Sequence, residues 1–251
     1  MHIRFRGLLA AILLAGASVA QALTVDEIVA RHIEARGGMD RIKAIQASVT
    51  TGTMSFSGDF AVELALVTYA ERPDRLRNEA SLQGLTQVQA YDGKEGWQIQ
   101  PFGGRKDPEK LSADDVKGLA DSADMDGPLV DWRAKGHQVE YLGTEDVDGT
   151  EALKLKVTQR NGDIKYIYLD PDYFLQIRET VTRTVRGTEQ RFETDMGNYE
   201  QVAGVYMPFA YESGAAGGPK DQKITVQKIE VNVPIDDALF AFPSAPATPA
   251  Q

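Results

Sequence analysis

The stretch FAVELAL, residues 60–66, alternates bulky apolar residues with small or charged ones. Successive side chains of a β-strand point to opposite faces, so this alternation predicts a half-buried strand. The bulky positions are Phe60, Val62, Leu64 and Leu66, and the intervening ones are Ala61, Glu63 and Ala65. The same alternation extends from about Ala47 to Pro101 and resumes from His137 to about Val233.

Turn signals divide both stretches into short strands. In the first stretch they are Ser57-Gly58-Asp59, Arg72-Pro73-Asp74, Gln83-Gly84 and Asp92-Gly93, which predict about five strands. In the second stretch they are Asp148-Gly149, Asn161-Gly162-Asp163, Asp170-Pro171-Asp172, Arg186-Gly187 and Gly197-Asn198. Strands joined by such short turns are antiparallel, and ten or eleven of them in one domain exceed what a flat sheet tolerates. We therefore predict a mainly β (α+β) fold whose strongly curved sheet forms a barrel or an incomplete barrel, with a bulge near Gln227 or Lys228.

Three further segments have helical signals. Thr24 and Glu27 form a capping-box pattern before a helix that Gly37-Gly38 ends. Met39 to Ile45 predicts a short second helix. Between the two strand-rich stretches, about residues 107–136 lack the alternation, and Ser112 can cap a helix there. A further short helix is expected from Pro128 to Ala134.

The ends of the chain read differently from the 23–243 domain between them. His2, Arg4 and Arg6 precede an uncharged run and then Ala20-Gln21-Ala22, the layout of a signal peptide covering residues 1–22. We expect cleavage after Ala22, a periplasmic location and no membrane span afterwards. Residues 244–251 are rich in proline and alanine, which predicts a disordered tail.

Charge and cysteine content exclude several classes of function. The formal net charge is −10, which disfavours nucleic-acid binding because phosphates would be repelled. The acidic surface keeps a secreted protein dispersed, and steering toward a basic partner is the alternative. The chain has no cysteine, so disulfides, a lipidated cysteine and thiolate metal sites are all excluded.

Several segments, taken in order, resemble the outer-membrane lipoprotein-sorting (LolA-like) family. They are the opening helix with Gly37-Gly38, the run from Arg72 to Arg77, Tyr91-Asp92-Gly93 with Trp97, Val147-Asp148-Gly149, Tyr168-Leu169-Asp170, the run from Phe174 to Arg178, and Leu239-Phe240. The resemblance implies an incomplete barrel closed by helices over a hydrophobic cavity. It also implies a periplasmic carrier of lipid or lipoprotein acyl chains, with an inner-membrane donor protein and an outer-membrane acceptor protein as partners.

A cavity of this kind needs inward apolar side chains and a lid, which the insertion at about 107–136 would supply. The predicted lining is Phe60, Val62, Leu64, Leu66, Trp97, Ile99, Tyr166 and Tyr168, with Leu129 and Trp132 from the lid. Each of these residues also suits an ordinary filled core. Arg75 and Arg77 share one face of a strand and are candidates for binding a lipid head group at the cavity mouth, although solvated arginines are the simpler interpretation.

No motif indicates a reaction, so we expect no catalytic residue, no metal and no cofactor. His32 and His137 lack spaced partners, and Asp124-x-Asp126-Gly127 fails as a calcium loop because Arg133 occupies the twelfth position. An enzyme or accessory protein using Glu63, His137 or the tyrosines on an apolar small molecule stays an alternative, as does a structural envelope interaction module. We expect a monomer, with a homodimer through an exposed sheet edge left open.

Overall fold

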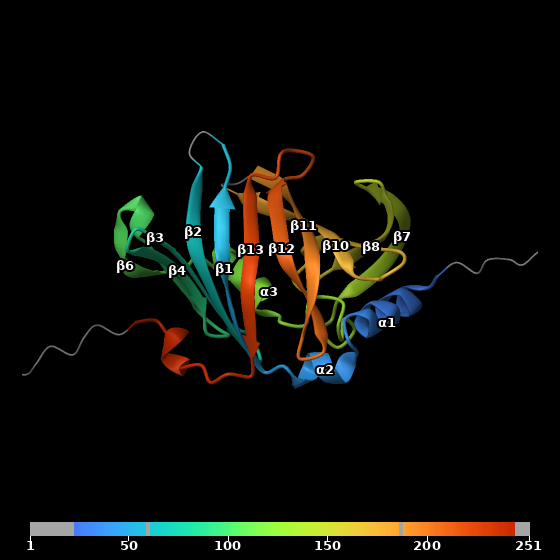
Figure 1. Cartoon of the computed structure of the whole chain (residues 1–251), viewed down its shortest axis with the longest axis horizontal. Coiled ribbons are helices and arrows are strands. Elements are labelled where there is room, and N and C mark those ends of the chain that lie inside the picture. Colours follow the sequence, from blue (N-terminus) through green and yellow to red (C-terminus); the bar gives the residue numbers. More distant parts are fainter. Residues whose placement is uncertain (1–22, 59–60, 186–187, 244–251) are drawn as a thin grey trace, which may run out of the picture.

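A computed structural model describes residues 23–58, 61–185 and 188–243 of the chain (Figure 1). The expected signal peptide, the expected disordered tail and the predicted lining residue Phe60 lie outside these residues. The single-domain boundaries therefore stay a prediction.

The described residues form one antiparallel sheet of 13 strands, in the order β6-β5-β4-β3-β2-β1-β13-β12-β11-β10-β9-β8-β7 (Figure 1). The strands are β1 (Ala47–Phe56), β2 (Val62–Glu71), β3 (Arg75–Leu82), β4 (Leu85–Tyr91), β5 (Gly96–Gln100), β6 (Arg105–Lys110), β7 (Gln138–Val147), β8 (Thr150–Thr158), β9 (Ile164–Leu169), β10 (Gln176–Val185), β11 (Thr188–Val202), β12 (Val205–Ala215) and β13 (Gln222–Val231). The sheet is not closed: β6 and β7 are its two edges although they follow each other along the chain. The segment that joins them, residues 111–137, is thus the insertion between the two arms of the sheet.

The sheet curls so that its two arms approach the same helix. Helix α3 (Ala113–Ala123) packs Leu119 and Ala123 against Leu76 of β3 and Tyr91 of β4 on one arm. On the other arm, the Lys165 ammonium of β9 lies 2.5 Å from the Asp121 carboxylate of the same helix. A flat sheet would place β4 and β9 far apart, so the predicted mainly β fold with a curved, incompletely closed sheet is confirmed.

Helix α1 (Val25–Ala35) and helix α2 (Met39–Ala44) form where the sequence predicts them. Thr24 and Glu27 make the predicted capping box. Helix α1 buries Ile28 and Val29 against β7, β8 and β9, including Leu155 and Ile167. This places α1 and α3 over different arms of the curved sheet.

Three local predictions were wrong. The expected helix from Pro128 to Ala134 is a series of turns, because Asp131 has a φ of +53° that a right-handed helix cannot contain. The expected turn at Gly197-Asn198 lies inside β11, and the chain reverses at Ala203-Gly204 instead. Strand β6 occupies the start of the expected insertion, where its charged residues and proline hide it from an alternation test. It is one of the strands that raise the total to 13, above the ten or eleven expected.

The bulge near Gln227 is confirmed. The pairing of β1 with β13 shifts between Thr51 and Gly52, which face Lys228 and Val226. Gln227 is therefore the extra residue of β13, and the bulge accounts for the break in its alternation.

Two short 3-10 turns complete the described elements, η1 (Pro101–Gly103) and η2 (Asp237–Leu239). Turn η2 belongs to the segment after β13 that packs against the β3–β5 arm through Phe240.

Candidate functional site

A row of apolar side chains crosses the middle of the sheet on the face that α3 covers. The strand register aligns Leu64, Met54, Ile224, Tyr211 and Met196 on β2, β1, β13, β12 and β11. Residues directly opposite in antiparallel strands share a face, and Leu64 shares its face with Ala70, which packs against α3. Leu64 is buried, whereas the other four are only half-buried. The face on which α3 lies is the inner face of the curved sheet, and the opposite one is the outer face. The inner face thus offers apolar surface that the fold does not fully cover.

Two hollows flank the insertion. The first, of about 370 Å³, lies between α1 and the turns after α3, and its walls include Val29, Ile33, Leu129 and Trp132. The second, of about 560 Å³, lies between α3 and both arms of the sheet. Both volumes fall within the range of roughly 300–1,000 Å³ that is typical of small-molecule sites.

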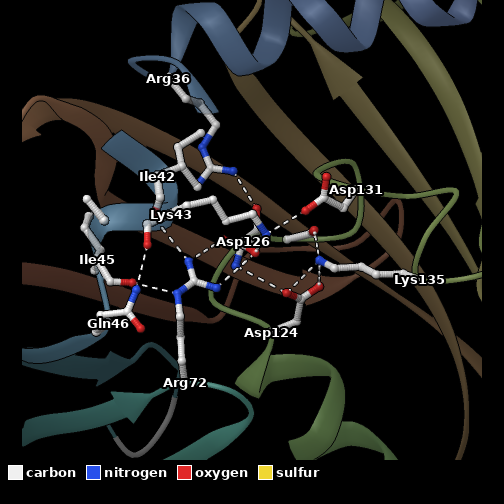
Figure 2. Close-up of polar contacts among 12 residues, drawn as sticks. Arg36, Ile42, Lys43, Ile45, Gln46, Arg72, Asp124, Asp126, Asp131 and Lys135 are labelled. Carbon is white, nitrogen blue, oxygen red and sulfur yellow. Dashed lines mark hydrogen bonds and ion pairs between the residues drawn. The ribbon is translucent and has the colours of Figure 1, made fainter. Parts of the chain in front are cut away.

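A polar cluster fixes the insertion to the sheet, and Asp126 is at its centre (Figure 2). The Asp126 carboxylate is 3% exposed and accepts hydrogen bonds from Arg72 at 3.0 and 2.5 Å and from Lys43 at 2.5 Å. Arg72 also donates to the carbonyl oxygens of Ile42, in the last turn of α2, and of Ile45, just after its end. Burial alone would raise the pKa of Asp126, but the hydrogen bonds from Arg72 and Lys43 lower it to about 2. The carboxylate is therefore ionised, and it joins α2, the β2–β3 turn and the insertion.

Neighbouring contacts extend this cluster along the insertion. Lys135 donates to both oxygens of Asp124, at 2.8 and 2.6 Å, and to the carbonyl oxygen of Gly127 (Figure 2). Lys43 pairs with Asp131 at 2.7 Å, and the Arg36 guanidinium donates to the Asp126 carbonyl oxygen at 2.6 Å. From the sequence, Asp124-x-Asp126-Gly127 is considered only as a calcium loop and rejected. No local signal indicates that Lys43 and Arg72 bind the Asp126 carboxylate.

The predicted lining residues fall on both faces of the sheet. Val62, Leu64 and Leu66 lie on the inner face with α3. Trp97 pairs with Ala90, which pairs with Arg77, and this register puts Trp97 and Ile99 on the opposite face. Alternation along a strand shows that successive residues lie on opposite faces of the sheet. It does not show which residues of the next strand lie on the same face.

The remaining lining residues are divided in the same way. Tyr166 and Tyr168 lie opposite Lys156 and Lys154, on the face of β8 away from α1. The Lys154 ammonium lies over both tyrosine rings, and the Tyr168 hydroxyl donates to Glu145. The predicted lid residues Leu129 and Trp132 do line a hollow, the one beside α1.

Arg75 and Arg77 already have partners on the outer face. Arg75 pairs with Glu71 at 2.8 Å and with Asp237 at 2.6 Å. Arg77 pairs with Glu79 at 2.7 Å and donates to the Leu239 carbonyl oxygen at 2.8 Å. The segment around η2 therefore occupies the place where sequence reasoning puts a lipid head group.

The described residues contain no group of histidine and acidic side chains that could hold a metal ion. His32 is buried, and its Nδ1 donates to the Phe174 carbonyl oxygen at 2.8 Å. Burial, together with the nearby Arg36 charge, lowers the pKa of His32 to about 4. Glu63 and His137, the other candidates for chemistry, lie apart: Glu63 is exposed on the outer face of β2, and His137 lines the larger hollow.

Comparison with solved structures identifies the fold. A LolA superfamily protein from Nitrosomonas europaea superposes with a TM-score of 0.58 at 12% identity, covering 88% of this chain and 98% of that one. The chain has the LolA-like fold. A putative outer membrane lipoprotein-sorting protein domain from Vibrio parahaemolyticus gives a TM-score of 0.58 at 10% identity, covering 86% and 97%. A DUF1329 family protein from Desulfovibrio piger gives 0.59 at 13% identity, covering 86% and 97%.

The resemblance inferred from sequence is thus confirmed at the level of the LolA-like fold. No protein-family model matches the chain, and no curated protein matches it in sequence. None of the helices in the described part of the chain is long and apolar enough to cross a bilayer.

Proposed function

We propose that this LolA-like protein is a periplasmic carrier that binds an acyl chain against the inner face of its sheet, beneath the insertion, and catalyses no reaction. The observation that carries the proposal is the row of half-buried apolar side chains on the face shared with α3. Met54, Ile224 and Met196 represent it on β1, β13 and β11. An apolar ligand that covers such a surface removes it from water, which favours binding.

The physical chemistry suits a lipid. Each methylene removed from water contributes about 0.8 kcal/mol, so a partly covered acyl chain binds usefully without any specific polar contact. Methionine side chains adapt to irregular apolar ligands because they are unbranched and polarizable. The row runs across five neighbouring strands, which suits an extended chain better than a compact ligand.

The fold and the sequence support the biological setting. Two of the solved structures that share the fold are described as a lipoprotein-sorting domain and a LolA superfamily protein. The signal-peptide pattern of residues 1–22 indicates export. A carrier would take lipid or a lipoprotein anchor from an inner-membrane donor and release it to an outer-membrane acceptor, as a monomer.

The direct test is to purify the protein from a Gram-negative periplasm, extract it with organic solvent under denaturing conditions, and search for bound lipid by mass spectrometry. A stoichiometric acylated species is the expected result. An empty protein that also fails to bind a fluorescent fatty acid would overturn the proposal in favour of an interaction module.

Paired variants locate the site. Leu66 and Ala65 are adjacent on β2 but point to opposite faces. Leu66→Gln should weaken binding of the fluorescent fatty acid about tenfold, because a polar group replaces an apolar one on the proposed binding face. Ala65→Gln should leave the affinity unchanged, and equal effects of the two variants would place binding elsewhere.

A further inference from the structure

The larger hollow, of about 560 Å³, is lined by polar and charged groups from five separate segments. Asp74 belongs to the β2–β3 turn, Tyr91 ends β4, and Lys117 lies on α3. His137 directly precedes β7, and Arg160 lies in the turn between β8 and β9. Because these segments belong to both arms and to the insertion, the curvature of the sheet creates the hollow.

The cations on one side of the hollow are only partly compensated, because the carboxylate that lines the hollow with them, Asp121, is paired with Lys165 at 2.5 Å. Within the described part of the chain, no carboxylate forms an ion pair with Arg160, and Lys117 has only Asp114 at 3.6 Å, on the exposed side of α3. Lys135, by contrast, is held by Asp124 at 2.6 Å. Arg160 and Lys117 are thus available to an anionic ligand.

His137 adds a directed donor to this side. Its Nδ1 accepts a hydrogen bond from the Arg160 backbone N–H at 3.2 Å. A neutral imidazole with an accepting Nδ1 carries its proton on Nε2, so Nε2–H is left to donate. Burial lowers the pKa of His137, and the Lys135 charge lowers it further despite Asp124 and Asp121, which favours the neutral form of the ring.

The other side of the hollow has the opposite character. Among the described residues, no cation forms an ion pair with Asp74. Asp74 and Tyr91 line the hollow together. Burial raises the pKa of Tyr91, and the charges of Asp74 and Asp92 raise it further. A carboxylate beside a phenol ring suits an ammonium group, which can pair with the charge and lie against the ring.

We propose that this hollow binds a phosphoethanolamine head group, with the phosphate at Arg160, Lys117 and His137 and the ammonium at Asp74 and Tyr91. Several donors from different segments suit a phosphate, which has more acceptor oxygens than a carboxylate. The inference rests on the proposed function, because it adds a head-group site to the proposed acyl carrier. It also moves that site away from Arg75 and Arg77, whose partners are already within the chain.

Three soluble probes separate the two halves of the head group. Phosphoethanolamine carries both charges, glycerol 3-phosphate carries only the phosphate, and ethanolamine carries only the ammonium. Titration calorimetry on the purified protein should give phosphoethanolamine an affinity about tenfold higher than either partial probe. The NMR signals of the His137 ring should move during this titration, whereas those of buried His32 should not.

Variants assign each half. Arg160→Gln should weaken both phosphate-containing probes about tenfold, and Asp74→Asn should weaken phosphoethanolamine alone. Lys94→Gln, in the exposed β4–β5 turn, should change neither. Equal binding of all three probes, unmoved His137 signals, or an Arg160→Gln protein with unchanged affinity would each overturn the head-group site.

A free amino acid is the competing zwitterion. Glycine binding as tightly as phosphoethanolamine would overturn the phosphate assignment. The fluorescent fatty acid carries no phosphoethanolamine, so its binding and its sensitivity to Leu66→Gln test the carrier proposal separately. If the fatty acid binds and the three head-group probes do not, only the head-group site is overturned. If the probes bind and the fatty acid does not, only the acyl site is overturned.

Discussion

Arg72 and Asp126 form a two-point contact in which both terminal nitrogens of the guanidinium donate to the two carboxylate oxygens, at 3.0 and 2.5 Å. The residues are 54 positions apart in the chain. Arg72 adjoins the sheet at the β2–β3 turn, while Asp126 belongs to the insertion. This pair therefore attaches the insertion to the sheet.

Asp126→Asn should destabilise the protein by about 2 kcal/mol, because it removes a buried charge and leaves Arg72 and Lys43 without it. Asp131→Asn is the matched control: Asp131 also pairs with Lys43, but it is 43% exposed. It should cost less than about 1 kcal/mol. Urea unfolding of both variants measures the difference, and similar losses would show that burial of Asp126 contributes nothing.

The same carboxylate predicts an acid limit of stability. Its folded pKa of about 2 lies below the ordinary value of 3.8, so it stabilises the fold above pH 4 and loses that contribution as the pH falls toward 2. Asp126→Asn should flatten the stability profile in this window. An unchanged profile for the variant would contradict the low pKa.

His32 predicts a second loss of stability at milder pH. The folded pKa of about 4 lies below the ordinary 6.5, so the unfolded chain binds more protons between these values and falling pH favours unfolding. The free energy of unfolding should fall by about 2 kcal/mol from pH 7 to pH 5 through this residue. Urea titrations at both pH values should show a smaller difference for His32→Gln, while His137→Gln should retain most of it. An equal difference in wild type and His32→Gln would exclude His32 as the cause.

Gly37 and Gly38 show how far local sequence reasoning reaches. The pair predicts the end of α1 correctly, and both residues have positive φ. The sequence does not reveal that a Cβ on Gly37 would lie 2.2 Å from the Gly204 carbonyl oxygen, whereas one on Gly38 would only touch a side chain at 3.6 Å.

Gly37→Ala should therefore destabilise the protein clearly more than Gly38→Ala, because the backbone of the β11–β12 turn cannot yield as a side chain can. The backbone conformation alone costs each variant on the order of 1–3 kcal/mol. Thermal unfolding of both proteins provides the comparison, and equal midpoints would mean that the turn moves away at little cost.

Other features were predictable because their causes lie in neighbouring residues. They are the capping box at Thr24 and Glu27, the alternation in β2, and the bulge at Gln227. What could not be predicted depends on contacts between distant segments. Nothing local to Trp97 says that its strand turns this residue to the outer face, and nothing near Arg160 says that Asp74 shares its hollow. The positive φ of Asp131 likewise has no local sequence signal, and it removes a helix that the local apolar residues favour.

The outer face of the β3–β5 arm gives the last prediction. Trp97 is 3% exposed, and its indole N–H donates to the Phe240 carbonyl oxygen at 2.8 Å. Phe240 is 1% exposed beneath the Arg75 guanidinium. Phe240→Ala should cost about 3 kcal/mol, as truncation of a buried phenylalanine does, whereas Phe242→Ala, at a residue 41% exposed, should cost less than about 1 kcal/mol.

Trp97 reports this change directly when Trp132, the second of the two tryptophans, is replaced by phenylalanine in every sample. Loss of the Phe240 side chain should expose the Trp97 indole to water and shift its fluorescence to longer wavelength. The Phe242→Ala protein should shift it less, because Phe242 contacts the indole only edge-on, at 6.3 Å between ring centres. A destabilised Phe240→Ala protein with unshifted Trp97 emission would mean that the segment stays in place without its anchor, so that the hydrogen bonds to Arg77 and Trp97 hold it.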